Sequence, residues 1–159
     1  MLEMAPRTPT PFVREPRLLL ERAQRAFEQG RLKETVDLLE QVLTLDHDST
    51  AIRTMLGIAY ARLRQVDQAF EHLERGVALD PEAFGPRCAL GELYLRLAIP
   101  EEARTHLDRA LALASTPAER SYISGLLREE RSRNRKRAYR PSFRKPFWSW
   151  RRKDKEGQE

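Results

Sequence analysis

The chain has 159 residues, which suggests one domain with room for tails, and its 33% charged and 8% aromatic residues fit an elongated helical protein with a thin core. The single cysteine, Cys88, excludes an internal disulfide and gives no sign of an oxidising compartment. Residues 1–15 lack an apolar targeting segment, and no apolar run approaches the roughly 20 residues of a bilayer span. We therefore expect a soluble, cytoplasmic protein.

Charge is distributed unevenly along the chain. Residues 1–15 are neutral, residues 16–117 carry 13 lysines and arginines against 16 acids, and residues 118–159 carry 14 against 6. The net charge of +5 therefore conceals a mildly acidic body and a strongly basic C-terminal region, which have to be interpreted separately.

The first 15 residues are proline-rich and lack apolar periodicity, which predicts a disordered arm. After this arm the sequence repeats with a period of 34 residues. Leu56-Gly57-x-x-Tyr60 recurs as Leu90-Gly91-x-x-Tyr94. The same offset joins four further identical pairs: Ala69 and Ala103, His72 and His106, Leu73 and Leu107, Leu79 and Leu113. With a weaker first copy, the repeats fall at 16–49, 50–83 and 84–117, as expected for stacked helical pairs.

Three glycines of the repeats carry structural information. Gly57 and Gly91 fall inside predicted helices, where glycine costs about 1 kcal/mol relative to alanine. This cost is explained if a neighbouring helix approaches closely at each glycine, with Ala69 and Ala103 as the facing small residues. Gly30 predicts a left-handed end to the first helix of the first copy.

The repeats resemble the tetratricopeptide-repeat (TPR) family. The second copy carries the family pattern at Leu56, Gly57, Tyr60, Ala69, Leu73 and Pro81, and the third at Leu90, Gly91, Tyr94, Ala103, Leu107 and Ala110. Arg53 and Arg87 occupy the usual aromatic position, and Gly76 replaces a small alanine. The resemblance covers about two-thirds of the chain. It implies an all-α fold, a right-handed superhelix (solenoid) of three helix-turn-helix units plus a C-terminal capping helix.

A seventh helix is predicted within residues 116–137. Thr116-Pro117-Ala118-Glu119 is a capping box with proline at the first helical position. Apolar residues at helical spacing follow at Ala118, Tyr122, Ile123, Leu126 and Leu127. We expect the first three turns to seal the end of the third copy, and the basic stretch beyond Leu127 to project into solvent or fray.

The resemblance implies that the first helix of each pair lines a concave groove, where members of the family bind peptides. The expected groove positions lie off the packing stripe of these helices: Gln24, Phe27, Thr54, Ile58, Arg62, Cys88, Glu92, Leu95 and Arg96. Their mixture of apolar and charged side chains suits an extended or helical segment of a partner protein. The plainer alternative is that some of them only pack against the next helix.

One TPR subtype clamps the C-terminal carboxylate of heat-shock chaperones with lysine, asparagine and arginine at fixed groove positions. Those positions hold other residues here: Leu20, Gln24, Met55, Gly85 and Ala89. Because the donors are missing, the sequence argues against a chaperone-tail carboxylate clamp.

Residues 138–159 form a tail in which aromatic residues alternate with cations, and Pro141 and Pro146 exclude a continuous helix. Its candidate binding residues are Arg144, Lys145, Phe147, Trp148, Trp150, Arg151 and Arg152. This mixture fits stacking on unpaired bases of a nucleic acid, the interface of an anionic membrane, or anchoring in a protein groove. A solvated tail that only aids solubility is less favoured, because exposed tryptophans are rarely idle.

The sequence predicts no enzyme, since it has no phosphate-cradling glycine loop, no nucleophile in a recognisable setting and no Cys/His cluster for a metal. It predicts no catalytic residue, metal site or cofactor. We interpret the chain as a TPR scaffold or adaptor whose groove binds a partner protein, with the tail as a second attachment point. One alternative is a nucleic-acid or ribosome-associated protein that binds mainly through its tail. The other is a structural subunit of a larger or membrane-associated complex, located at the periphery of the membrane or complex through its tail.

Overall fold

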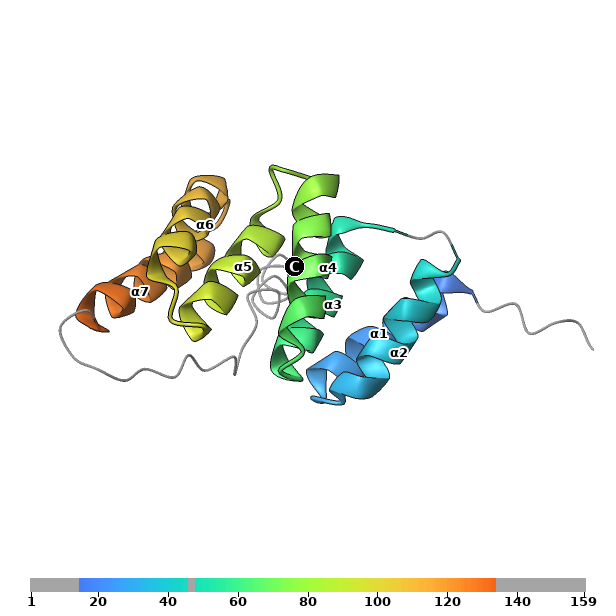
Figure 1. The fold of residues 1–159 in the computed structure, drawn as a ribbon. Coiled ribbons are helices and arrows are strands. Elements are labelled where there is room, and N and C mark those ends of the chain that lie inside the picture. The colour runs from blue at the N-terminus through green and yellow to red at the C-terminus, as the bar shows by residue number, and fades with distance from the viewer. Residues whose placement is uncertain (1–14, 46–47, 134–159) are drawn as a thin grey trace, which may run out of the picture. The chain divides into compact units, whose positions relative to one another are not determined.

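The computed structural model describes residues 15–45 and 48–133, and within these ranges the chain forms seven α-helices and no strand (Figure 1). The predicted all-α helical repeat fold is confirmed. The chain separates into two compact units, an N-terminal unit (Met1–His47) and a C-terminal unit (Asp48–Glu159). The division falls two residues before the boundary between the first and second sequence copies.

The N-terminal unit is one helical pair, α1 (Pro16–Glu28) and α2 (Leu32–Leu43), whose helices pack against each other. Leu19, Ala23 and Phe27 of α1 are buried, as are Leu39 and Val42 of α2. These residues recur at helical spacing, so each helix presents one apolar stripe to the core.

The C-terminal unit contains five helices: α3 (Thr50–Arg62), α4 (Val66–Leu79), α5 (Phe84–Arg96), α6 (Pro100–Leu113) and α7 (Pro117–Arg133). Figure 1 shows them from α3 and α4 in green to α7 in orange. α3 packs on α4 and α5 on α6, while α5 also contacts α3, α4 and α7. The two pairs are the second and third sequence copies, so the 34-residue period is a structural period.

The helical glycines lie where α3 meets α4 and where α5 meets α6. A Cβ atom added to Gly57 would lie 2.4 Å from Cγ of Leu73, and one added to Gly91 would lie 2.6 Å from Cγ of Leu107. Both leucines are fully buried. The close helix approach predicted from the sequence is therefore present in both copies.

In all three copies, the turn after the first helix contains a residue in the left-handed conformation at the same repeat position. Gly30 has φ +73°, as predicted, but the equivalent positions hold Arg64 at φ 64° and Ala98 at φ 60°. In each case the next residue's N–H donates to a carbonyl five residues earlier; these bonds are Arg31 to Ala26, Gln65 to Tyr60 and Ile99 to Tyr94, at 2.8–3.0 Å. This is the Schellman arrangement, which satisfies the last carbonyls of a helix.

Helix α7 begins as the capping box predicts. The N–H of Glu119 donates to Oγ1 of Thr116 at 3.1 Å, and the N–H of Thr116 donates to Oε2 of Glu119 at 3.0 Å. Because Glu119 turns its carboxylate toward these donors, it is buried, whereas the neighbouring Ala118 is exposed and does not join the predicted apolar stripe. Ile123, Leu126 and Leu127 are buried as expected for a cap.

The fourth turn of α7 is held to the preceding helix. Glu130 is only 4% exposed, and Nη2 of Arg104 in α6 donates to both of its carboxylate oxygens, at 2.9 and 3.2 Å. The expectation that the helix projects or frays immediately beyond Leu127 is therefore wrong over this turn, because a long-range ion pair replaces the missing apolar contacts.

Candidate functional site

The predicted groove positions of the N-terminal unit differ in exposure. Gln24 is exposed on α1, whereas Phe27 is 2% exposed and belongs to the core of its unit. As binding contacts, both positions stay predictions.

In the C-terminal unit the predicted groove positions lie on α3 and α5, which pack against each other. Most of them are buried, namely Thr54, Ile58, Cys88, Glu92 and Leu95. Arg62 and Arg96 are partly exposed, and each is the last residue of its helix. Among the predicted positions on these two helices, the two accessible ones are therefore both basic.

Glu92 is the centre of a buried polar cluster that joins α5 to α7. The hydroxyl of Tyr122 donates to Oε1 of Glu92, and Sγ of Cys88 lies 3.7 Å from the same oxygen. Burial raises the pKa of Glu92 to about 7, and this outweighs the opposing effects of its neighbours: the Tyr122 hydrogen bond, Arg96, Cys88 and Arg62. A carboxyl in such a setting changes its charge near neutral pH.

The same surroundings suppress the reactivity of Cys88. Its side chain is fully buried, and burial together with the adjacent Glu92 raises the pKa of the thiol well above its ordinary value. Because the thiolate is the nucleophile, the Cys88 thiol has the character of a packed core residue.

Sequence reasoning missed Tyr122 as a partner of the predicted groove, although a signal was present. The 34-residue offset that takes Gly57 to Gly91 also takes Gly91 to Gly125 and Cys88 to Tyr122. Helix α7 is therefore in register with the first helices of the repeats. This explains why it contacts α5 and covers positions of the third copy that the sequence alone leaves open.

The positions that carry donors in the chaperone-tail clamp hold no such donors here. Gln24 is exposed, Ala89 is buried, and the others, Leu20, Met55 and Gly85, are partly exposed. The exclusion of that clamp stays a prediction from residue type.

The predicted tail contacts lie outside the described residues: Arg144, Lys145, Phe147, Trp148, Trp150, Arg151 and Arg152. So does nearly all of the N-terminal arm. Within residues 15–45 and 48–133, no group of three or more His, Cys, Asp or Glu side chains is placed to hold a metal ion. Across the same ranges, no helix has the length and apolar character that a bilayer crossing requires.

Comparison with known proteins gives a family match and a set of shared folds. The family model for the tetratricopeptide repeat matches residues 26–82. No curated protein matches the chain.

Three solved structures illustrate the fold similarity. The first TPR of Spaghetti (RPAP3), bound to the HSP90 peptide SRMEEVD, is 24% identical with a TM-score of 0.65, over 74% of this chain and 90% of that one. The Yersinia enterocolitica type III secretion chaperone SycD, in complex with a peptide of the translocator YopD, is 19% identical with a TM-score of 0.66, over 74% and 93%. A chain of the APC/C hetero-tetramer Cut9-Hcn1 is 27% identical with a TM-score of 0.66, over 75% of this chain and 24% of that one.

The repeat model covers most of the first two copies, and the solved structures share the fold of about three-quarters of the chain. The third copy repeats the helix contact of the second, with Gly91 against Leu107 as Gly57 lies against Leu73. On these grounds, residues 26–82 match the tetratricopeptide repeat, and the third copy shares the helix contact of the second.

Proposed function

We propose that the protein is a non-catalytic scaffold that holds a segment of a partner protein on the surface formed by α3 and α5. The observation that carries the proposal is the pair Arg62 and Arg96. They occupy the same position in consecutive copies, both are partly exposed, and both act electrostatically on Glu92. Two such arginines offer a repeated set of donors to a bound chain, and arginine is among the residues most often found at the centre of protein interfaces.

The buried groove positions have a supporting role in this proposal. Ile58 and Leu95 are each 4% exposed, and Thr54 and Cys88 are no more accessible. Their size and packing set the shape of the surface from beneath, while the arginines make the contacts. In the N-terminal unit, Gln24 is a separate proposed contact, because it is exposed.

Solved TPR structures support a binding role of this kind. The RPAP3 domain holds a peptide of HSP90, and SycD holds a peptide of its translocator YopD. A helical repeat scaffold presents an extended surface without needing catalytic groups, because each copy contributes equivalent positions.

The test compares two double variants with the same change in charge. Arg62→Glu with Arg96→Glu reverses the proposed contacts, and Arg120→Glu with Arg128→Glu reverses two exposed arginines of α7. Proteins captured from native lysate are identified by mass spectrometry, and circular dichroism checks that both variants are folded. We expect a partner to be lost, at least about tenfold, only from the first variant. Equal retention by both folded variants would remove the α3–α5 surface from the proposal.

We further propose that the basic aromatic tail is a second attachment point. Joining two weak contacts in one chain raises the overall affinity without any new contact. Trp148→Ala with Trp150→Ala should then weaken capture of the same partner by about tenfold or more, and unchanged capture would remove the tail from the account. Loss of the captured material on nuclease treatment would identify the tail's ligand as nucleic acid instead.

A further inference from the structure

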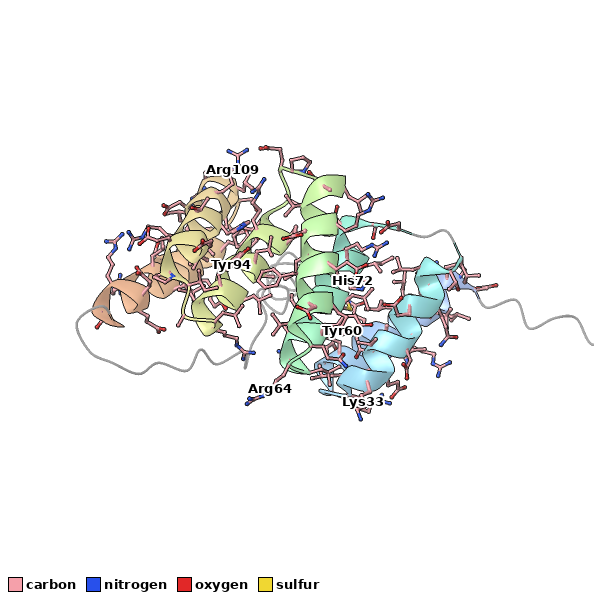
Figure 2. The ribbon with its side chains drawn as sticks, viewed as in Figure 1. Lys33, Tyr60, Arg64, His72, Tyr94 and Arg109 are labelled. Atoms are coloured by element: carbon pink, nitrogen blue, oxygen red, sulfur yellow. The ribbon has the colours of Figure 1, made fainter. Side chains whose placement is uncertain are left out.

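Asp48, just before the second copy, is linked to two arginines of that copy, and one of these arginines also reaches a histidine. Nε and Nη2 of Arg53 donate to the two carboxylate oxygens of Asp48 at 2.8 and 3.0 Å, and Nη1 lies 3.2 Å from Nδ1 of His72. Arg75 approaches the same carboxylate at 3.6 Å. His72 in turn stacks on Tyr60, with ring centroids 5.2 Å apart (Figure 2). The bidentate carboxylate therefore fixes the guanidinium in the orientation that reaches the histidine.

The third copy has the same two arginines and histidine at the same spacing, with a glutamate in place of the aspartate before it, but their connections differ. Arg87, His106 and Arg109 stand 34 residues after Arg53, His72 and Arg75, and Glu82 stands 34 residues after Asp48. His106 stacks on Tyr94 with centroids 5.4 Å apart, as His72 does on Tyr60. Glu82, however, is bonded to Arg109 and not to Arg87.

Two buried nitrogen atoms of the third copy consequently lack hydrogen bonds. Nη2 of Arg87 makes a 3.5 Å contact with the carbonyl of Pro81, while its Nε has no partner. Nδ1 of His106 has none either, and these two are the only buried side-chain nitrogen or oxygen atoms without a partner in the part of the chain that the structure describes. Burial and, as a smaller effect, Arg87 lower the pKa of His106, so the two groups are near each other. Buried polar groups in this state are rare and costly, so their occurrence together calls for an explanation.

We propose that Arg87 and His106 form a carboxylate-binding site for an aspartate or glutamate side chain of a bound protein segment. The second copy supplies the template. A carboxylate on Nε and Nη2 of Arg87 would orient the guanidinium so that Nη1 donates to Nδ1 of His106. One ligand thus satisfies both unpaired nitrogens. The site uses α5 and α6 and goes beyond the proposed α3–α5 surface, whose residues it does not share.

Glu82 could compete with an external carboxylate for Arg87, because it occupies the position that Asp48 has relative to Arg53. Its ion pair with Arg109 is exposed, with 68% of the Glu82 side chain and 46% of the Arg109 side chain accessible. Exposed pairs contribute little, so a rotation of Glu82 onto Arg87 has a small cost. The experiment therefore has to separate Glu82 from an external carboxylate.

The probe is the capped tripeptide acetyl-Ala-Asp-Ala-amide, with its Asn counterpart as the uncharged control. Each is titrated into the full chain at constant ionic strength, while the side-chain nitrogen resonances of Arg87 and His106 are followed by NMR. We expect saturable shifts at both residues with the Asp peptide, and an affinity about tenfold lower or undetectable with the Asn peptide. Arg87→Gln should abolish the His106 response.

Two further variants make the test decisive. Asp48→Ala opens the equivalent site of the second copy, so Arg53 and His72 should now respond as Arg87 and His106 do. Glu82→Gln should leave the affinity of Arg87 for the Asp peptide unchanged. The proposal is overturned if His106 gives no saturable response to the Asp peptide. It is also overturned if Glu82→Gln, without peptide, shifts the His106 resonance and also increases the affinity for the Asp peptide at least about fivefold. Glu82 would then be the carboxylate that occupies the site in the native chain.

Discussion

A glycine inside a helix destabilises the helix, and this cost is compensated only where the glycine allows a neighbouring helix to pack closely. The chain offers both situations in one unit. Gly57 faces buried Leu73 at a distance that excludes a Cβ atom, whereas a Cβ atom added to Gly125 in α7 would meet nothing within 4 Å. The first glycine permits the helix contact, and the second does not serve such a contact within the described structure.

This contrast gives a prediction at the level of single residues. Gly57→Ala should lower the free energy of unfolding by about 1–3 kcal/mol, because overpacking against Leu73 exceeds the gain in helix propensity. Gly125→Ala should raise it by up to about 1 kcal/mol, since only the propensity gain applies. Urea unfolding of both variants measures the difference. Shifts of the same sign and size would contradict the close contact.

Glu92 makes the C-terminal unit sensitive to pH. Its pKa rises from an ordinary value of 4.5 to about 7 in the folded chain. Between these values the folded state binds the proton more readily than the unfolded state. The stability contributed by Glu92 is therefore fully present below about pH 4.5 and is lost as the pH rises through about 7. With about 1.4 kcal/mol for each pKa unit, the loss is on the order of 3 kcal/mol.

The corresponding variant is Glu92→Gln, which keeps an acceptor for the Tyr122 hydroxyl and removes the titration. Relative to this variant, the native chain should lose stability between about pH 5 and pH 7.5. Chemical unfolding across this range measures the slope, with Glu129→Gln as a control at an exposed position of α7. Parallel stability profiles for the native chain and Glu92→Gln would show that Glu92 is not the responsible group.

At the scale of elements, the helix ends show that the repeat dictates backbone geometry more strongly than residue type does. Gly30, Arg64 and Ala98 share a left-handed conformation although only glycine adopts it without strain. The structure accepts the strain in two copies because the Schellman bonds at Gln65 and Ile99 require that turn.

Relieving that strain should stabilise the chain. Ala98→Gly and Arg64→Gly should each raise the free energy of unfolding by about 0.5–1 kcal/mol, because both side chains are exposed and only the backbone term changes. Gly30→Ala is the matched reverse change. Because no atom lies within 4 Å of the added Cβ, only the backbone strain changes, and the variant should be destabilised by a similar amount. Thermal unfolding followed by circular dichroism checks all three. A lower melting temperature for Ala98→Gly would contradict the assignment of strain.

The sequence predicted those elements whose signal lies in local residue type. Few other residue types can take the place of those that form the glycine contacts, the Gly30 helix end and the capping box at Thr116. The left-handed turns at Arg64 and Ala98 have no such residue signal and follow only from their register with Gly30. The Arg104–Glu130 ion pair was missed because a charge run resembles a solvated face until its partner, 26 residues away, is placed beside it.

The candidate site was less predictable than the fold for the same reason. Helical periodicity identifies which side of α5 is off the packing stripe, but it does not show that α7 brings Tyr122 onto Glu92. Burial of Cys88 and Leu95 depends on tertiary contacts of this kind. The arginines were included among the groove positions, yet only their accessibility singles them out as proposed contacts.

At the scale of the whole molecule, the protein combines helical repeats with a basic aromatic tail. We expect the two to act in series: the helical body selects the partner, and the tail, where the positive charge of the chain is concentrated, strengthens the attachment. On this account, removing the tail lowers affinity without changing which protein is bound.

The measurement that tests this most directly is affinity capture from native lysate by the full chain and by a version that ends at Arg137, each with and without nuclease. We predict that both versions retain the same nuclease-resistant protein, with a smaller yield from the shorter one. If truncation empties the capture, or if nuclease releases everything that was bound, the helical body is not the recognition element and the account is wrong.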